Sequence, residues 1–171
     1  MESKYSKLKK VLNKNLTLFF DKNYPYTASK KSKKTHTATL GIGGNIANTR
    51  RRFQKLFTFL QHSPVVDIMH TSPILKNPPF GYTKQRDFYN AVMVIKTDLN
   101  PTNLLKFILR VEQFFKRDRS FKNSPRTLDI DIIFFDKIAV NKKDLTIPHP
   151  HYHARESVLI PLAYIIQKVR Q

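Results

Sequence analysis

Two aspartates, Asp129 and Asp131, stand one residue apart in the apolar stretch PRTLDIDIIFF. Alternate side chains of a β-strand share a face, so the two carboxylates would lie side by side, with α-carbons about 6.6 Å apart. Such carboxylates repel each other, and burying either without a partner is costly. A polar outer strand face is the alternative, but the apolar end of the stretch indicates burial on both faces. The spacing therefore favours Mg²⁺, which proteins hold with one or two carboxylates plus substrate phosphates.

Three arginines, Arg117, Arg119 and Arg126, precede this pair in the segment FKRDRSFKNSPR. Guanidinium groups bind phosphate oxygens two at a time. Favourable charge at a helix C-terminus explains Arg117 and in part Arg119, but it does not explain Arg126, which would enter the strand. Arginines beside a metal held by carboxylates are typical of phosphoryl transfer. The sequence has neither a GxxxxGK[ST] loop nor a kinase motif set.

Three histidines at alternate positions in PHPHYH, residues 148–153, suggest a second kind of metal site. The two prolines make this segment rigid and extended, and the sequence shows no further ligand cluster of the zinc type. A single histidine that donates to a phosphate is the simpler interpretation.

Composition limits the function classes. The chain of 171 residues contains no cysteine, which excludes disulfides, zinc–thiolate sites and thiol nucleophiles and suits a reducing cytoplasm. No apolar run is long enough for a membrane span, so we expect a cytoplasmic protein. The net charge of +19 favours anionic partners such as nucleic acid or phosphorylated substrates.

Residues 1–35 look separate from the remainder, 36–171, which would form one domain. This N-terminal extension carries ten lysines against two acidic residues. Apolar residues between Leu8 and Phe20 fall near helical spacing, and the polar run Lys30–Lys34 follows. We therefore expect a basic, partly helical extension exposed to solvent.

The order of elements in residues 36–171 indicates the fold. Four strand-like segments are predicted at 37–42, 65–71, 87–97 and 127–135, and GIGGN (41–45) is predicted to be a tight turn. One helix follows Asn48 and another begins at Asn100-Pro101, each with asparagine as N-cap. Strand, helix, strand, strand, helix, strand is the order of a ferredoxin-like α/β sandwich, a mostly antiparallel sheet with helices packed on it.

Several of these motifs together resemble a known family. FYNAV, then a helix, PRTLDIDI and IPHP…ARESVLIPL match 6-hydroxymethyl-7,8-dihydropterin pyrophosphokinase in order and spacing, over about residues 37–166. The resemblance implies a ferredoxin-like fold and pyrophosphate transfer from ATP to the hydroxymethyl group of the pterin, with release of AMP, in folate biosynthesis. It also implies ATP as co-substrate and two Mg²⁺ ions.

The resemblance assigns roles to individual residues. Asp129 and Asp131 would hold Mg²⁺, and Arg117 and Arg126 would assist catalysis. The predicted ATP-binding residues are Glu112, Arg119, Ile132, Thr146, His149 and Arg155. The predicted pterin-binding residues are Gly43, Asn77, Pro78, Pro79, Phe80, Phe88 and Asn90. Ser157 stands where the family usually has an aromatic residue against the pterin, so Phe121 or Lys122 would cover the pocket instead.

A basic RNA-binding module on a ferredoxin-like sheet is the main alternative, because many RNA-binding proteins use this fold. The RNP signature is missing, however, and a carboxylate pair on the binding face would repel a phosphate backbone. A catalytically inactive homologue is a third possibility. We expect a monofunctional, monomeric enzyme with small-molecule substrates and without nucleic-acid or membrane partners.

Overall fold

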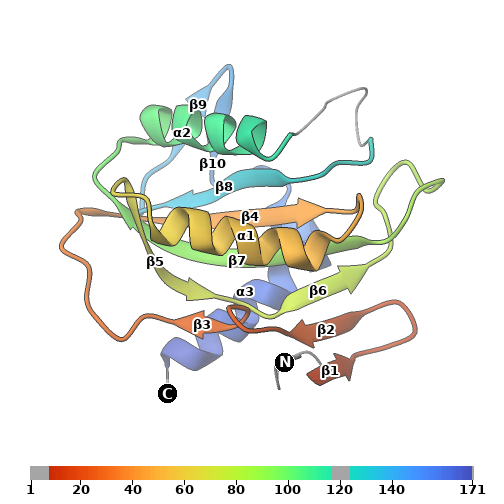
Figure 1. The fold of residues 1–171 in the computed structure, drawn as a ribbon. Coiled ribbons are helices and arrows are strands. Elements are labelled where there is room, and N and C mark those ends of the chain that lie inside the picture. Colours follow the sequence, from red (N-terminus) through yellow and green to blue (C-terminus); the bar gives the residue numbers. More distant parts are fainter. Residues whose placement is uncertain (1–7, 117–123, 171) are drawn as a thin grey trace.

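A large sheet with helices on both faces organises the chain in the computed structural model, which describes residues 8–116 and 124–170 (Figure 1). The strands are β1 (Leu8–Val11), β2 (Thr17–Phe20), β3 (Tyr26–Thr27), β4 (His36–Gly44), β5 (Val66–Thr71), β6 (Ile74–Asn77), β7 (Phe88–Thr97), β8 (Asp129–Phe135), β9 (Val140–Lys142) and β10 (Leu145–Ile147). The helices are α1 (Thr49–Gln61), α2 (Pro101–Phe114) and α3 (Glu156–Val169), with a short 3-10 helix, η1 (Tyr152–Ala154).

The strand order is β1-β2-β6-β7-β4-β8, with β5 also beside β7 and β3 beside β5. The pairs that build the centre of the sheet, β4 with β7, β4 with β8 and β5 with β7, are antiparallel. Helices α1 and α2 cover one face, and α3 lies on the other (Figure 1). This arrangement confirms the predicted ferredoxin-like sandwich, in which two helices cover one face of the sheet.

Both predicted helix starts are correct. Asn48 caps α1 by accepting a hydrogen bond from the Arg51 N–H, and Asn100 caps α2 in the same way from Asn103, with Pro101 in the first turn. The apolar stripes of the two helices pack on the sheet in one hydrophobic core. Phe114, the last residue of α2, is 66% exposed.

The described part of residues 1–35 is not helical, so the predicted helix is wrong there. Residues 8–20 form the antiparallel pair β1 and β2, which we call the N-terminal hairpin. Strand β2 also pairs with β6 and so joins the central sheet. The physical reason is that the apolar side chains alternate between the two faces of a strand. Leu16 and Leu18 are buried on one face, and Phe20 packs beside them. Phe19 does not join this cluster and contacts Tyr89.

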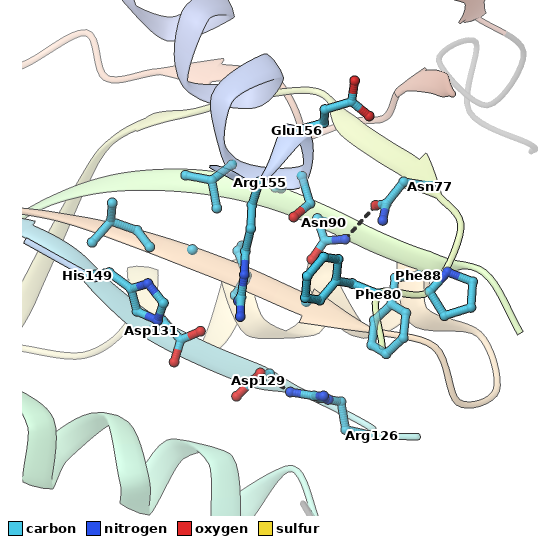
Figure 2. Close-up of a pocket in the computed structure, with 18 of the residues that line it drawn as sticks. Asn77, Phe80, Phe88, Asn90, Arg126, Asp129, Asp131, His149, Arg155 and Glu156 are labelled. Carbon is cyan, nitrogen blue, oxygen red and sulfur yellow. Dashed lines mark hydrogen bonds and ion pairs between the residues drawn. The ribbon is translucent and has the colours of Figure 1, made fainter. Parts of the chain in front are cut away.

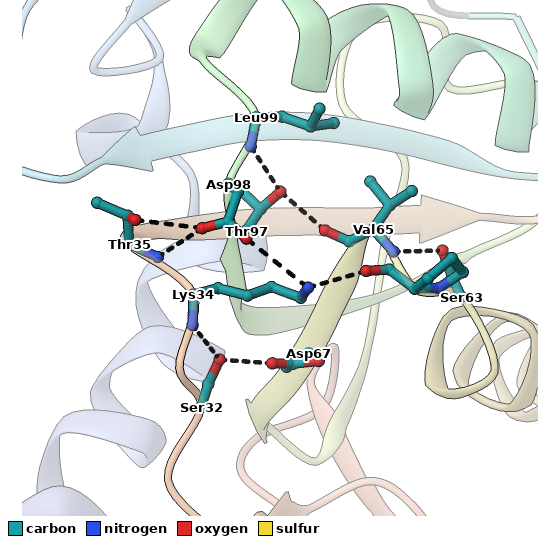
Figure 3. Close-up of polar contacts among 10 residues, drawn as sticks. Ser32, Lys34, Thr35, Ser63, Val65, Asp67, Thr97, Asp98 and Leu99 are labelled. Atoms are coloured by element: carbon teal, nitrogen blue, oxygen red, sulfur yellow. Dashed lines mark hydrogen bonds and ion pairs between the residues drawn. The ribbon is translucent and has the colours of Figure 1, made fainter.

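Further along the extension, Tyr24 is completely buried in the main core, where its hydroxyl donates to the Phe53 carbonyl at 3.1 Å. Residues 32–35 are also held by hydrogen bonds (Figure 3). Ser32 donates to Asp67, the Lys34 ammonium donates to the Pro64 carbonyl, and Thr35 donates twice to Asp98. Residues 8–35 thus contribute a hairpin, a core residue and a hydrogen-bonded strap to the same sheet.

No helix in the two described ranges is long and apolar enough to cross a membrane.

Candidate active site

A pocket of about 780 Å³ opens on the face of the sheet that carries α3. Strands β4, β6, β7 and β8, the loop after β6 and the start of α3 line it (Figure 2). Most of the predicted site residues meet there: Gly43, Asn77, Pro78, Pro79, Phe80, Phe88, Asn90, Arg126, Asp129, Asp131, His149 and Arg155.

Two glycines of β4 form the floor of the pocket. Gly41 and Gly43 line the pocket, and the register places Gly43 between Asn90 of β7 and Asp129 of β8. A Cβ on Gly43 would lie 2.6 Å from the Asn90 Oδ1. GIGGN is therefore not the predicted turn, because its glycines extend β4 to Gly44 and leave space where side chains would otherwise stand.

The carboxylate pair has the predicted orientation. Asp129 and Asp131 both line the pocket, whereas Ile130 and Ile132 are buried in the core on the opposite face. A β-bulge opposite the step from Thr39 to Leu40 then interrupts this alternation.

Arg126 is fixed next to the carboxylates by its backbone and by its side chain. Its guanidinium donates to the Asp129 carboxylate at 2.5 Å. Its N–H donates to the Asn45 side chain, and its carbonyl accepts from the Asn45 N–H, each at 3.0 Å. Asn45 is 5% exposed and also donates to Gln85 and to the Arg86 carbonyl, so it connects the end of β4, the entry to β8 and the loop before β7.

The donor set at β8 fits Mg²⁺. Two carboxylates share one face of an edge strand and border a large open pocket, and hard oxygen ligands of this kind, completed by substrate phosphates and water, suit magnesium. The described residues contain no group of three or more His, Cys, Asp and Glu side chains that could hold a metal by themselves. A metal here would therefore depend on ligands from a substrate.

His149 faces the same end of the pocket, and its tautomer follows from its partner. The His151 N–H donates to His149 Nδ1 at 3.2 Å, so in the neutral ring the proton is on Nε2. Burial lowers the pKa of His149 below its ordinary value of 6.5, and the charges of Arg155 and His151 lower it further, against an opposite effect of Asp129. The ring is therefore a neutral Nε2–H donor at neutral pH.

Figure 2 shows Arg155 reaching from the start of α3 into the pocket. We call Arg126, Asp129, Asp131, His149 and Arg155 the charged end.

The opposite side carries amides and aromatic rings. Asn90 donates to the Asn77 Oδ1 at 2.7 Å (Figure 2). Phe80 and Phe88 also line this side, each with an arginine near its ring: Arg155 is 5.9 Å from the Phe80 centroid and Arg126 is 5.4 Å from that of Phe88. We call Asn77, Phe80, Phe88 and Asn90 the amide end. Neutral amides and ring faces suit a flat heteroaromatic ligand.

Some predicted residues lie elsewhere. Glu112 is buried, and its carboxylate accepts a hydrogen bond from the Ile130 N–H at 2.7 Å, on the side of β8 that pairs with no strand in the described part of the chain. Ile132 is in the core and Thr146 is exposed on β10, so neither side chain lines the pocket. Arg117, Arg119, Phe121 and Lys122 lie outside the described residues.

Several residues that line the pocket were not predicted as site residues, among them Gly41 and Glu156. Gly41 lines the floor below Asp131, and Glu156 lies at the mouth beside Arg155. The alternation of Gly41 and Gly43 along a strand was the available signal for the floor, since alternate residues share a face. Ser157, which the resemblance places where the family usually has an aromatic residue, also lines the pocket.

Fold and site together define a class: a ferredoxin-like protein whose pocket joins carboxylates and arginines at one end to amides and aromatic rings at the other. Residues 39–167 match the family model described as 7,8-dihydro-6-hydroxymethylpterin-pyrophosphokinase (HPPK). The chain belongs to this family, as its sequence motifs had indicated.

Bacterial relatives support the same assignment. A protein of Helicobacter pylori is 39% identical over 142 residues, which is 82% of this chain and 87% of the relative. A protein of Campylobacter jejuni is also 39% identical over 142 residues, 83% of this chain and 90% of the relative. A protein of Bacillus subtilis is 34% identical over 134 residues, 78% and 80% of the two chains. All three are named 2-amino-4-hydroxy-6-hydroxymethyldihydropteridine pyrophosphokinase.

Proposed function

We propose that the protein transfers pyrophosphate from ATP to 6-hydroxymethyl-7,8-dihydropterin, giving AMP and the pterin pyrophosphate, a step in tetrahydrofolate biosynthesis. Membership of the pyrophosphokinase family supports this activity. The structural observation that supports the activity is the arrangement of groups in the pocket. Groups suited to phosphates and groups suited to a flat ring occupy different sides of it: the carboxylate pair lies on the edge strand β8, and Asn77 and Asn90 lie on β6 and β7, beyond β4.

The pterin belongs at the amide end. The polar edge of the pterin would meet Asn90, whose amide is oriented by Asn77, and its ring would lie against Phe88. Asn90, Gly43 and Asp129 are aligned on adjacent strands, so the α-carbons of Asn90 and Asp129 are two strand spacings apart, about 10 Å. This span accommodates a bicyclic ring with its hydroxymethyl group directed at the carboxylates.

The nucleotide belongs at the charged end and extends along β8 on the side where Glu112 lies. His149 and Arg155 would bind its phosphates, the former through Nε2–H. Glu112, Ile132 and Thr146 lie around the same strand, where Ile132 would act through its backbone because its side chain is buried. Arg117 and Arg119 complete the proposed set from the undescribed segment.

We propose that Asp129 and Asp131 hold two Mg²⁺ ions. Bound magnesium neutralises phosphate charge and polarises the phosphorus that is attacked. For Asp129 to take this role, Arg126 must exchange its ion pair with the carboxylate for the phosphate chain.

The reaction is an in-line displacement. The hydroxymethyl oxygen of the pterin forms a bond to the β-phosphorus, the bond from that phosphorus to the oxygen bridging the α-phosphate breaks, and AMP leaves. The hydroxyl proton passes to water. We assign no strong general base, because positioning and electrostatic stabilisation carry most phosphoryl transfers. Closure of the loop that contains Phe80, which is 74% exposed, would exclude water that competes for the pyrophosphate.

We further propose that the enzyme acts as a monomer in the cytoplasm, in keeping with the absence of cysteine. The family match and the named relatives give no support to the RNA-binding alternative.

The direct test is AMP formation from ATP and Mg²⁺ with and without 6-hydroxymethyl-7,8-dihydropterin. We expect AMP only when the pterin is present. Release of ADP, or AMP formation that ignores the pterin, would exclude the proposed reaction. An oligonucleotide-binding assay at several salt concentrations tests the RNA-binding alternative separately.

A further inference from the structure

The short strand β6 joins the amide end to the N-terminal hairpin. One side of β6 pairs with β7, where Leu75 lies opposite Asn90 and Asn77 lies opposite Phe88. The other side pairs with β2, where Leu18 lies opposite Leu75 and Thr17 lies opposite Lys76, the neighbour of Asn77. Strand β6 has only four residues, and without the hairpin it would be a short sheet edge, which is marginally stable.

Side-chain packing fixes the hairpin to both elements that frame the amide end. Leu16 and Leu18 are 5% and 6% exposed, and they form a cluster with the fully buried Leu75 of β6. Ile160 of α3 packs against this cluster, two residues after Val158, which lines the pocket. The hairpin is therefore packed against β6 and against the first half of α3 (Figure 1).

The amide pair needs this support because its geometry is set from two sides. On the β4 side, Gly43 leaves just enough room for the Asn90 side chain. On the β6 side, the Asn77 Oδ1 accepts a hydrogen bond from the Asn90 Nδ2, which determines which way the Asn90 amide is turned. A shift of β6 would break or reorient that hydrogen bond, and the Asn90 amide could then turn over, which exchanges the positions of its donor and its acceptor.

We propose that the N-terminal hairpin is a positioning element for ring recognition: Leu16 and Leu18 hold β6 in place, β6 orients Asn77, and Asn77 orients Asn90. The identity of the ring as a pterin rests on the proposed function. Asp129 and Asp131 of the charged end lie away from this support, since three strands separate β2 from β8 in the sheet.

The experiment compares Leu18→Ala with Leu60→Ala in the full-length chain. Both changes remove the same atoms from a buried leucine, 6% and 3% exposed, but Leu60 lies near the end of α1, in the main core. The probe is 6-hydroxymethylpterin, titrated by its fluorescence with Mg²⁺ and α,β-methylene-ATP, which cannot transfer pyrophosphate. Nucleotide binding is measured alone, by calorimetry.

We expect Leu18→Ala to weaken pterin binding about tenfold and to change nucleotide binding by less than about twofold. Leu60→Ala should lower the melting temperature to a similar extent and leave both affinities near those of the wild type. Leu18→Val, a milder change, should weaken pterin binding by a smaller but measurable factor, again without an effect on nucleotide binding, and it serves if Leu18→Ala does not fold. Equal loss of pterin affinity in the two alanine variants, or none in Leu18→Ala, would overturn the proposal.

A ligand-free readout separates this proposal from the proposed function. The side-chain amide NMR signals of Asn77 and Asn90 should shift in Leu18→Ala and not in Leu60→Ala. If the wild type fails to bind the pterin, the proposed function is wrong, while the amide signals still decide whether the hairpin positions Asn90. Unchanged signals in Leu18→Ala would refute the positioning role.

Discussion

The charged end and the amide end of the pocket hold their polar groups by different means. At the charged end, ionised groups compensate one another, as in the Arg126–Asp129 ion pair. At the amide end, the neutral Asn77 and Asn90 share one hydrogen bond, and a glycine provides the space for them. Stabilisation of developing charge acts mainly on turnover, whereas a fitted neutral surface acts on affinity. Substitutions at the two ends should therefore change different kinetic constants.

Asp129→Asn should have the largest effect. The change keeps the size of the side chain and an acceptor for Arg126 but removes the charge that would hold Mg²⁺. We expect turnover to fall on the order of 10³-fold, the scale seen when a main electrostatic contact is lost. Pterin affinity should change little, because Asp129 is outside the amide end. Pterin-dependent AMP formation over a series of Mg²⁺ concentrations measures the first effect.

Circular dichroism and the melting temperature are the controls, because the variant must remain folded for its turnover to be informative. Near-normal turnover in a folded Asp129→Asn protein would remove the metal role assigned to Asp129.

Gly43→Ala should act mainly on affinity and by a smaller factor. Its Cβ would stand 2.6 Å from the Asn90 Oδ1, so the amide must move. We expect the KM for the pterin to rise about 30-fold while the KM for ATP stays within about threefold. Steady-state kinetics with each substrate varied in turn measures both constants.

Gly41→Ala is the matched control two residues away on the same face. Its Cβ would approach only the flexible end of Ile133, at 3.2 Å, and lies beside Asp131 instead of Asn90. It should therefore spare the KM for the pterin. If Gly41→Ala and Gly43→Ala raise the KM for the pterin equally, the charged end and the amide end do not act separately as the geometry indicates.

The same comparison explains which parts of the site the sequence could predict. Asp129, Asp131 and Arg126 are neighbours in the chain, and strand periodicity alone places both carboxylates on one face. The amide end is assembled from β4, β6 and β7, whose pairing depends on contacts distant in sequence. Asn77 and Asn90 were identified only through the resemblance to a family.

The two errors in the fold have related causes. The apolar residues from Leu8 to Leu16 fit helical spacing, yet those from Leu16 to Phe20 alternate, and pairing with β6 decides for a strand. Gly41 and Gly43 were interpreted as a turn because glycine tolerates unusual backbone angles. In the structure their useful property is the missing side chain, which only the neighbouring strands reveal.

The pH response of His149 gives the smallest expected effect and tests the charged end further. The pKa of this ring is lowered by burial and by Arg155, so the folded protein takes up its proton at a lower pH than the unfolded chain does. The contribution of neutral His149 to the free energy of unfolding is fully present above pH 6.5. It is lost as the pH falls through the lower pKa of the folded protein. Protonation also removes Nδ1 as acceptor for the His151 N–H.

We expect a modest fall in melting temperature as the pH is lowered from 6.5. The fall should be smaller in His149→Asn, because asparagine can accept the same hydrogen bond without titrating. NMR titration of the His149 ring gives the direct check, and a midpoint at or above 6.5 would contradict a neutral histidine in a partly desolvated, positively charged site.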